Sequence, residues 1–169
     1  YYNGKEHDTI ERGKSFLDDL PSIENIVMVE YIQSYQGDIE NCSTLLEVLS
    51  NRPENEVEFT HVPFDHPLCI LYSSGTTGAP KCIVHGHGGT LLQHLKELQL
   101  HADVREDDRV FYFTTCSWMM WNWLVSALAS KATVMLFDGS PSYPGWDTLW
   151  DFAEAEKFTL FGTSAKYIE

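Results

Sequence analysis

Short runs of apolar residues recur along this chain and alternate with segments of helical periodicity. Buried strands are indicated at residues 25–32, 68–73, 109–115 and 132–138, and residues 159–162 begin a fifth strand. Because these runs are nearly continuous rather than alternating, they are typical of strands in a sheet that is covered on both faces. The pattern predicts an α/β fold with a mostly parallel sheet flanked by helices.

Two polar pairs mark the starts of predicted helices. Thr44 with Glu47, and Thr90 with Gln93, have the spacing of a capping box, in which the two side chains satisfy free backbone N–H groups. The helix that starts at Thr90 is expected to run to about residue 101, with a stripe of leucines on one face.

Three further helices are predicted, at residues 8–17, 119–130 and 147–157. The middle one is apolar nearly all round, so we expect it in the interior, and Asp147 is expected to cap the last one. Residues 51–66 are rich in proline and polar groups and predict a surface connection, with a short strand at residues 57–61.

The length and charge of the chain limit the classes of function that it can have. Its 169 residues suffice for one domain or for a slice of a larger one, and the absence of a first Met suggests a piece of a longer protein. No stretch approaches the roughly 18 apolar residues of a membrane span. The formal charge of −14 would repel phosphate backbones and argues against nucleic-acid binding, but not against a small phosphate ligand held by local groups.

Cysteine and histidine spacings predict no metal site. The four cysteines form no CxxC pair, and we expect reduced, buried thiols in a cytosolic protein, with Cys69 and Cys116 inside apolar runs. His85 and His87 lack the spacing of convergent zinc ligands. His94 is expected on the surface of its helix.

One loop carries a chemical signal. Residues 73–81 read SSGTTGAPK and follow an apolar strand. Glycines let the backbone approach a ligand, successive N–H groups can form an anion-binding nest, and the hydroxyls and Lys81 add donors for phosphate oxygens. The loop is not a Walker A motif, because Pro80 stands where the second glycine belongs. A flexible loop without a ligand is the alternative.

The loop resembles the Ser/Thr-Ser-Gly-Ser/Thr-Thr-Gly-x-Pro-Lys signature of adenylate-forming enzymes, which include acyl-CoA synthetases and luciferases. The resemblance implies that this loop holds the β- and γ-phosphates of ATP, and that Pro80 sets the exit of the turn. The implied phosphate-binding residues are Ser73, Ser74, Gly75, Thr76, Thr77, Gly78 and Lys81.

Within this family the chain is similar to the acetoacetyl-CoA synthetases. The similar segments are residues 2–5, 63–68, 85–97, 118–123, 138–141 and 161–167. The resemblance covers essentially the whole chain and implies that residues 1–169 are an incomplete part of the AMP-binding N-terminal domain. It also implies that Trp118 borders the acyl pocket, whereas Trp121 and Trp123 are equally compatible with a plain core helix.

The resemblance implies a two-step ligase that takes acetoacetate, ATP with Mg²⁺, and CoA as small-molecule partners. Its catalytic, ribose and CoA contacts are expected outside these residues, so the chain alone is not expected to turn over. A related synthetase for acetate or another short acid remains open, as does a nucleotide-binding relative without turnover. Two departures from the family pattern are Ser117 and Lys131, each where glycine is expected.

Overall fold

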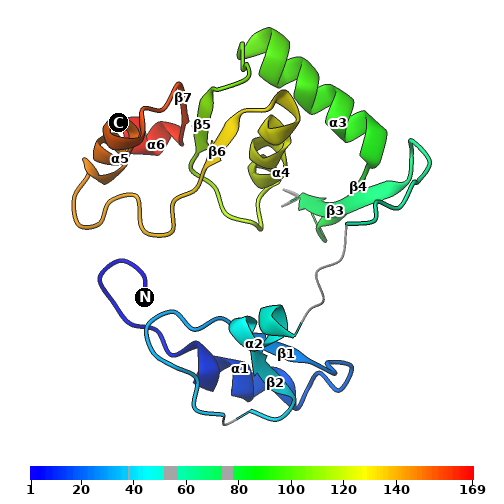
Figure 1. The fold of residues 1–169 in the computed structure, drawn as a ribbon, viewed down its shortest axis with the longest axis vertical. Coiled ribbons are helices and arrows are strands. Elements are labelled where there is room, and N and C mark those ends of the chain that lie inside the picture. The colour runs from blue at the N-terminus through cyan, green and yellow to red at the C-terminus, as the bar shows by residue number, and fades with distance from the viewer. Residues whose placement is uncertain (38, 52–56, 74–77) are drawn as a thin grey trace. The chain divides into compact units, whose positions relative to one another are not determined.

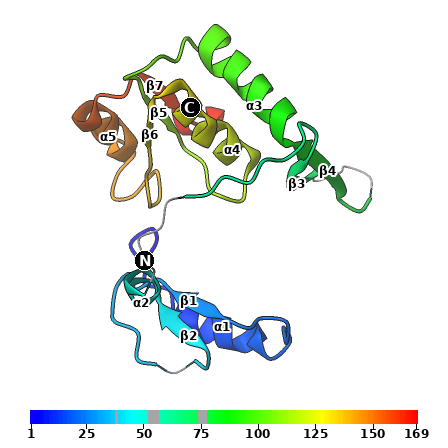
Figure 2. The same ribbon diagram turned by 45° about the vertical axis from the view of Figure 1, so that its right-hand side comes forward.

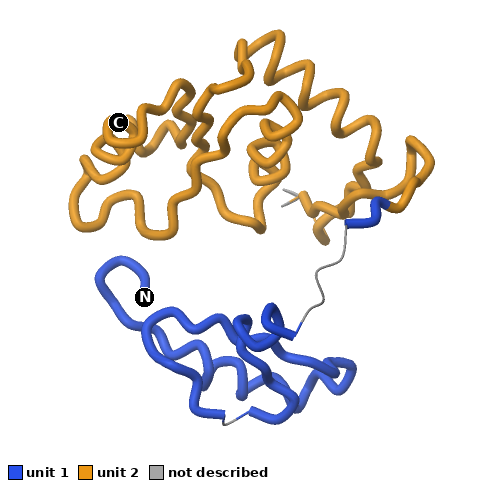
Figure 3. Tube along the Cα trace, viewed as in Figure 1, with its two compact units in different colours: residues 1–59 blue, residues 60–169 orange. Residues whose placement is uncertain are grey.

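The computed structural model describes residues 1–37, 39–51, 57–73 and 78–169. The chain divides into two units, residues 1–59 and residues 60–169 (Figure 3). The division falls within the connection predicted at residues 51–66. In the described part of the chain, no helix is both long and apolar enough to cross a membrane.

Residues 1–59 combine a two-stranded parallel sheet with two helices. The elements are α1 Thr9–Leu17, β1 Ile26–Met28, β2 Cys42–Thr44 and α2 Leu45–Ser50. An Asp8 carboxylate oxygen accepts hydrogen bonds from two backbone N–H groups at the start of α1. The capping box of Thr44 and Glu47 forms at the start of α2, as predicted. Strand β1 is shorter than predicted, because only residues 26–28 pair with β2.

An antiparallel hairpin opens the second unit. Strand β3 Pro67–Ser73 pairs with β4 Lys81–Gly86, so this part of the chain departs from the predicted parallel arrangement. The β3 side chains alternate between half-buried and exposed, and Ile70 and Tyr72 are exposed by 56% and 69%. The prediction that both faces are covered is wrong for β3, because two strands bury only one face here.

Helix α3 His87–Leu95 begins earlier than the predicted capping box at Thr90, and no side chain caps it. Instead, the N–H of His87 donates to the carbonyl of His66 at 2.9 Å, and the N–H of Gly88 donates to the carbonyl of Phe64 at 2.8 Å. A Cβ at Gly88 would lie 2.1 Å from the Phe64 ring, so only glycine allows this approach. Carbonyls of the preceding loop therefore accept the first free N–H groups of the helix, a role that we had predicted for the Thr90 side chain.

A parallel sheet of order β6-β5-β7 forms the centre of the second unit. Its strands are β5 Arg109–Tyr112, β6 Thr133–Met135 and β7 Leu160–Gly162. On one face, Val110 packs in a buried cluster with Leu98 and Leu124. On the other face, Phe111 stacks on Phe158 with ring centroids 4.9 Å apart. The sheet lies between α4 and α5 (Figures 1 and 2). Strand β5 is therefore covered on both faces, and the predicted α/β fold is confirmed.

The remaining helices flank this sheet. They are the π-helix η1 Lys96–His101, α4 Met119–Ser126, the 3₁₀ helix η2 Ala127–Ser130, α5 Thr148–Glu156 and α6 Ala165–Ile168. The predicted interior helix at residues 119–130 is split into α4 and η2 and is not enclosed. Leu124 is buried, but Met119 and Leu128 are 45% and 58% exposed, because this chain covers only one side of the helix.

Three local predictions also need correction. Asp147 precedes α5 but its side chain makes no capping hydrogen bond; the Thr148 hydroxyl bonds to Gly145 instead. Residues 57–61 form no strand, since no described strand pairs with them. The cysteines are free but not buried: Cys82 and Cys116 are exposed, on the hairpin and in the turn before α4.

The departure at Lys131 has a structural consequence. Lys131 ends η2 in the left-handed region with φ of 60°, a conformation that glycine adopts at little cost. Its ammonium lies 3.2 Å from a Glu106 carboxylate oxygen. This contact is exposed at both ends, so it contributes little to stability.

Candidate active site

The predicted phosphate loop closes the β3–β4 hairpin. Ser73 is the last residue of β3, Lys81 is the first residue of β4, and the two are register partners. The hairpin therefore brings the two ends of the loop side by side. Lys81 is exposed, and among the described residues no carboxylate pairs with it. Its ammonium is available to an anion at this end of the hairpin.

The structure describes only part of the loop. Ser73, Gly78 and Lys81 are described, and a Cβ at Gly78 would meet no atom within 4 Å. The other four predicted phosphate-binding residues lie outside the described residues: Ser74, Gly75, Thr76 and Thr77. Their assignment remains a prediction from the sequence.

Trp118 lies immediately before α4, at the rim of a cavity of about 410 Å³. The cavity lies where β5 ends, which is the edge of a parallel sheet at which ligands bind in open α/β folds. Trp118 is 69% exposed, so its indole is accessible to a ligand. The lining residues are Tyr112, Phe113, Thr114, Thr115, Trp118, Met119, Met120 and Ser164.

The neighbours of Trp118 have different environments. Ser117, which stands in place of the expected glycine, is not among the residues that line this cavity; its hydroxyl lies 3.0 Å from that of Thr115. Trp121 lines a separate cavity of about 340 Å³. Trp123 packs against the Tyr112 ring at 6.0 Å and joins the buried cluster. Trp123 is therefore a core residue, and Trp118 alone of the three lines the first cavity.

The sequence assigned only Trp118 to the acyl pocket, and Met119, Met120 and Ser164 also line this cavity. Ser164 follows β7 and Thr114 follows β5, and these strands are parallel neighbours with Tyr112 opposite Gly162. The carboxyl ends of the two strands therefore meet at one edge. The available signal was polar residues at the ends of two predicted strands: Thr114 lies near the end of the strand at 109–115, and Ser164 comes two residues after the strand at 159–162. Strand order could not be read from the sequence.

His94 is buried in α3, whereas we predicted a surface position. Its Nδ1 lies 2.9 Å from the Ser126 hydroxyl, which itself donates to the Asn122 carbonyl at 2.8 Å. Because the hydroxyl proton is used there, Nδ1 must be the donor to Ser126. Burial lowers the pKa of His94, an effect that Glu97 opposes and His85 reinforces. The lowered pKa favours the neutral ring, and with Nδ1 as the donor to Ser126, Nε2 is its unprotonated nitrogen.

His94 and His85 also line a cavity of about 770 Å³ between the hairpin, α3 and α4. Most of the remaining lining is apolar, with Leu71, Met120 and Trp123 among its members. Within the described residues, no three His, Cys, Asp or Glu side chains gather in a group that could hold a metal ion.

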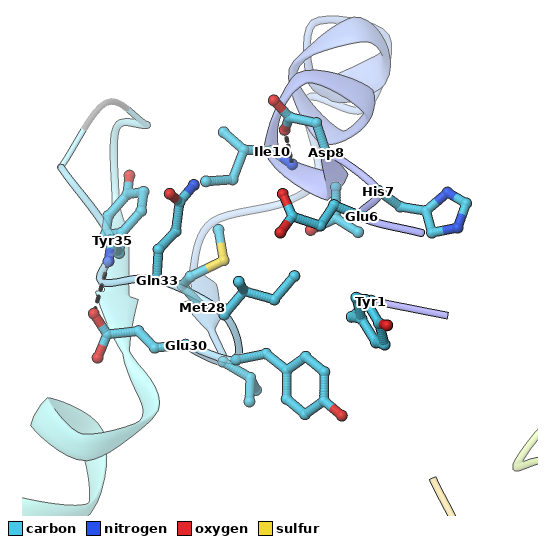
Figure 4. A pocket seen from close by; sticks show the side chains of 13 residues that line it. Tyr1, Glu6, His7, Asp8, Ile10, Met28, Glu30, Gln33 and Tyr35 are labelled. Atoms are coloured by element: carbon cyan, nitrogen blue, oxygen red, sulfur yellow. Dashed lines mark hydrogen bonds between the residues drawn. The ribbon is translucent and has the colours of Figure 1, made fainter. Parts of the chain in front are cut away.

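The first unit has a cavity of its own, of about 410 Å³ (Figure 4). Its lining comes from the start of the chain, from α1 and from the residues after β1. On one side, a Glu30 carboxylate oxygen accepts the backbone N–H of Tyr35 at 2.7 Å. None of the residues that the sequence singled out for phosphate or acyl binding lines this cavity.

Comparison with known proteins identifies the family. A model of the AMP-binding enzyme family, described as "AMP-binding enzyme", matches residues 6–168. The chain belongs to this family. Membership is consistent with a glycine- and hydroxyl-rich loop at the end of β3.

Individual members of the AMP-binding family resemble the chain along most of its length. An acetoacetyl-coenzyme A synthetase of Rhizobium meliloti is 48% identical over 176 residues, covering 100% of this chain and 26% of the relative. Malonamoyl-CoA synthetase vrtB of Penicillium aethiopicum is 47% identical over 150 residues, covering 84% of this chain and 21% of the relative. The chain thus spans about a quarter of the length of the curated relatives it matches.

A solved structure shows the same fold. The acetoacetyl-CoA synthetase from Streptomyces lividans superimposes with a TM-score of 0.86 at 43% identity, covering 99% of this chain and 25% of that one. The α/β arrangement described above is therefore that of the corresponding part of this AMP-binding enzyme.

Proposed function

We propose that this chain is part of the AMP-binding N-terminal domain of a ligase that activates acetoacetate. In the first step, a carboxylate oxygen of acetoacetate attacks the α-phosphorus of ATP, giving acetoacetyl-adenylate and releasing pyrophosphate. In the second step, the thiol of CoA attacks the acyl carbon and AMP leaves. The observation that carries the proposal is the loop that joins Ser73 to Lys81 at the turn of the hairpin, together with the similarity to acetoacetyl-CoA synthetases.

The proposed role of the loop is to hold the β- and γ-phosphates while pyrophosphate departs. Negative charge grows on the leaving group, and donors that are already in place stabilise it without reorganising. Lys81 supplies a full positive charge, while Ser73 and the other loop hydroxyls supply neutral donors. Ser73, Gly78 and Lys81 include no carboxylate, so Mg²⁺ fits this end of the hairpin only as its complex with ATP, where it neutralises phosphate charge.

The cavity at Trp118 is the proposed site of the acyl group. Its walls are the indole of Trp118 and the flexible side chains of Met119 and Met120, which suit a short carbon chain. The names of the relatives indicate acetoacetyl and malonamoyl groups, and both carry a second carbonyl at C3. We therefore assign a 3-oxo acid, with acetoacetate as the leading candidate, and we place the enzyme in the cytosol.

The test is acid-dependent exchange between ATP and pyrophosphate in the full-length protein that contains this chain. We expect the strongest exchange with acetoacetate, compared with acetate and butyrate. A preference for acetate would keep the adenylating chemistry but refute the 3-oxo acid assignment. Absence of exchange with every acid would refute the ligase proposal and favour a nucleotide-binding relative without turnover.

Substitution of Lys81 tests the phosphate role directly. We expect Lys81→Ala to lower the exchange rate by about 10²- to 10³-fold, the usual effect of removing one donor from a developing anion. Lys96→Ala is the matched control, because Lys96 is an exposed lysine of the same unit that lines none of the described cavities near Trp118. Equal exchange rates in the two variants would contradict the phosphate assignment.

A further inference from the structure

The lining of the cavity at Trp118 combines apolar side chains from one element with hydroxyl-bearing side chains from others. Trp118, Met119 and Met120 belong to the start of α4, whereas Thr114, Thr115 and Ser164 follow the ends of β5 and β7. An aliphatic acid needs only the apolar side chains. A 3-oxo acid also brings a carbonyl oxygen, and a carbonyl that leaves water without a new donor costs free energy.

The hydroxyls of this cavity are not equally available. The Thr114 hydroxyl lies 3.4 Å from the Thr115 carbonyl, and the Thr115 hydroxyl lies 3.0 Å from that of Ser117. The Ser164 hydroxyl bonds to no described residue, and it does not cap the short α6 that follows. Ser164 is therefore the hydroxyl of the strand-end wall whose proton and lone pairs remain free for a ligand.

Tyr112 carries a phenolic hydroxyl on the same lining, but its ring is held by packing. The ring lies over Gly162, where a Cβ would be 2.2 Å from its Cδ2, and it meets Trp123 edge-on. These contacts hold the Tyr112 ring against the sheet. Ser164, in contrast, comes after the end of β7 and lines the cavity.

We propose that Ser164 determines the preference for a 3-oxo acid, by donating its Oγ–H to the C3 carbonyl oxygen of the acyl group. This inference rests on the proposed function. In this arrangement Trp118 and the two methionines pack against the carbon chain, and the Ser164 hydroxyl donates a hydrogen bond to the carbonyl oxygen. Butyrate has the same chain length but lacks this carbonyl, so it leaves the hydroxyl without a partner. Discrimination arises because a site built around a donor loses that bond with the saturated acid.

The test compares acetoacetate with butyrate in the full-length protein, using kcat/KM for acid-dependent pyrophosphate exchange. We expect Ser164→Ala to lower the value for acetoacetate by about tenfold or more and to leave butyrate unchanged. Ser164→Thr keeps a hydroxyl and should restore much of the preference. Tyr112→Phe is the comparison variant, because it removes the phenolic hydroxyl from the same lining and should preserve the ratio of the two acids.

Three results would overturn the inference. Unchanged kcat/KM values for both acids in Ser164→Ala would show that Ser164 does not bind the C3 carbonyl. An equal loss for both acids would indicate a purely structural role, which thermal unfolding of the variant would reveal. A collapsed ratio in Tyr112→Phe would move the donor to Tyr112. Failure of the wild-type protein to exchange with any acid would instead refute the underlying ligase proposal.

Discussion

Gly162 provides a quantitative test of the packing next to the cavity at Trp118. It lies in β7 directly opposite Tyr112 of β5, and the Tyr112 ring covers it. A Cβ at this position would lie 2.2 Å from Cδ2, 2.8 Å from Cε2 and 3.0 Å from Cγ of that ring. All three distances are shorter than the roughly 3.5–4.0 Å of ordinary carbon–carbon contact.

The size of the expected effect follows from these distances. In Gly162→Ala, the Tyr112 ring must move by more than about 1 Å to restore normal contact. The ring cannot rotate freely, because it is half-buried and packs against Trp123 and the buried cluster. We therefore expect the cost of overpacking, about 1–3 kcal/mol of unfolding free energy. The displaced ring would also intrude on the cavity that Tyr112 and Ser164 share.

The assay is urea-induced unfolding of the full-length protein, together with acid-dependent pyrophosphate exchange. Gly89→Ala is the matched control, since Gly89 lies in α3 and no atom would come within 4 Å of the new Cβ. Alanine should stabilise that helix by about 0.5–1 kcal/mol. If Gly162→Ala were as stable as Gly89→Ala and kept full exchange activity, the Tyr112 ring could not lie over Gly162. The packing described here between β5 and β7 would then be wrong.

Two further predictions concern the α3–η1 segment. Leu98 is fully buried in the cluster that packs on one face of the sheet. Leu98→Ala should therefore lower the free energy of unfolding in urea by about 2–5 kcal/mol. Leu100 is 75% exposed, so Leu100→Ala should change that free energy by no more than about 0.5 kcal/mol. Burial lowers the pKa of His94 below its ordinary 6.5. Its contribution to stability is therefore complete well above pH 6.5 and is lost as the pH falls from there through the lower folded pKa, because in that range the unfolded chain binds the proton more readily than the folded chain. Urea unfolding from about pH 8 down to about pH 5 should therefore show a shallower loss in His94→Gln than in the wild type; parallel curves would refute a neutral, buried His94.

The amino-acid sequence alone determined the features that depend on local chemistry. The apolar runs located β3, β5, β6 and β7, since each run is short and ends at polar or turn-forming residues. The capping box at Thr44 formed as predicted, because its two hydrogen bonds join residues only three apart. The glycine- and hydroxyl-rich loop between Ser73 and Lys81 was recognisable because all of its candidate phosphate contacts lie in one continuous stretch.

Tertiary structure decided the features that depend on distant partners. The direction of β3 and β4 follows from pairing, which no single apolar run specifies, and the pair is antiparallel. Helix α3 starts at His87 rather than at Thr90, because carbonyls of His66 and Phe64 accept its first N–H groups. The spacing of Thr90 and Gln93 could not reveal that backbone carbonyls, rather than a side chain, would accept these N–H groups.

The candidate site shows the same division. Trp118 was assigned to the acyl pocket through the family resemblance of the segment at the start of α4, and in the structure it lines a cavity. Ser164 was not assigned to the site, because its place at the same cavity depends on the pairing of β7 with β5, which lie about fifty positions apart in the chain. His94 was misplaced for the same reason: its partner Ser126 is 32 residues away. Local propensity determines where elements form, but long-range packing decides which of their side chains meet.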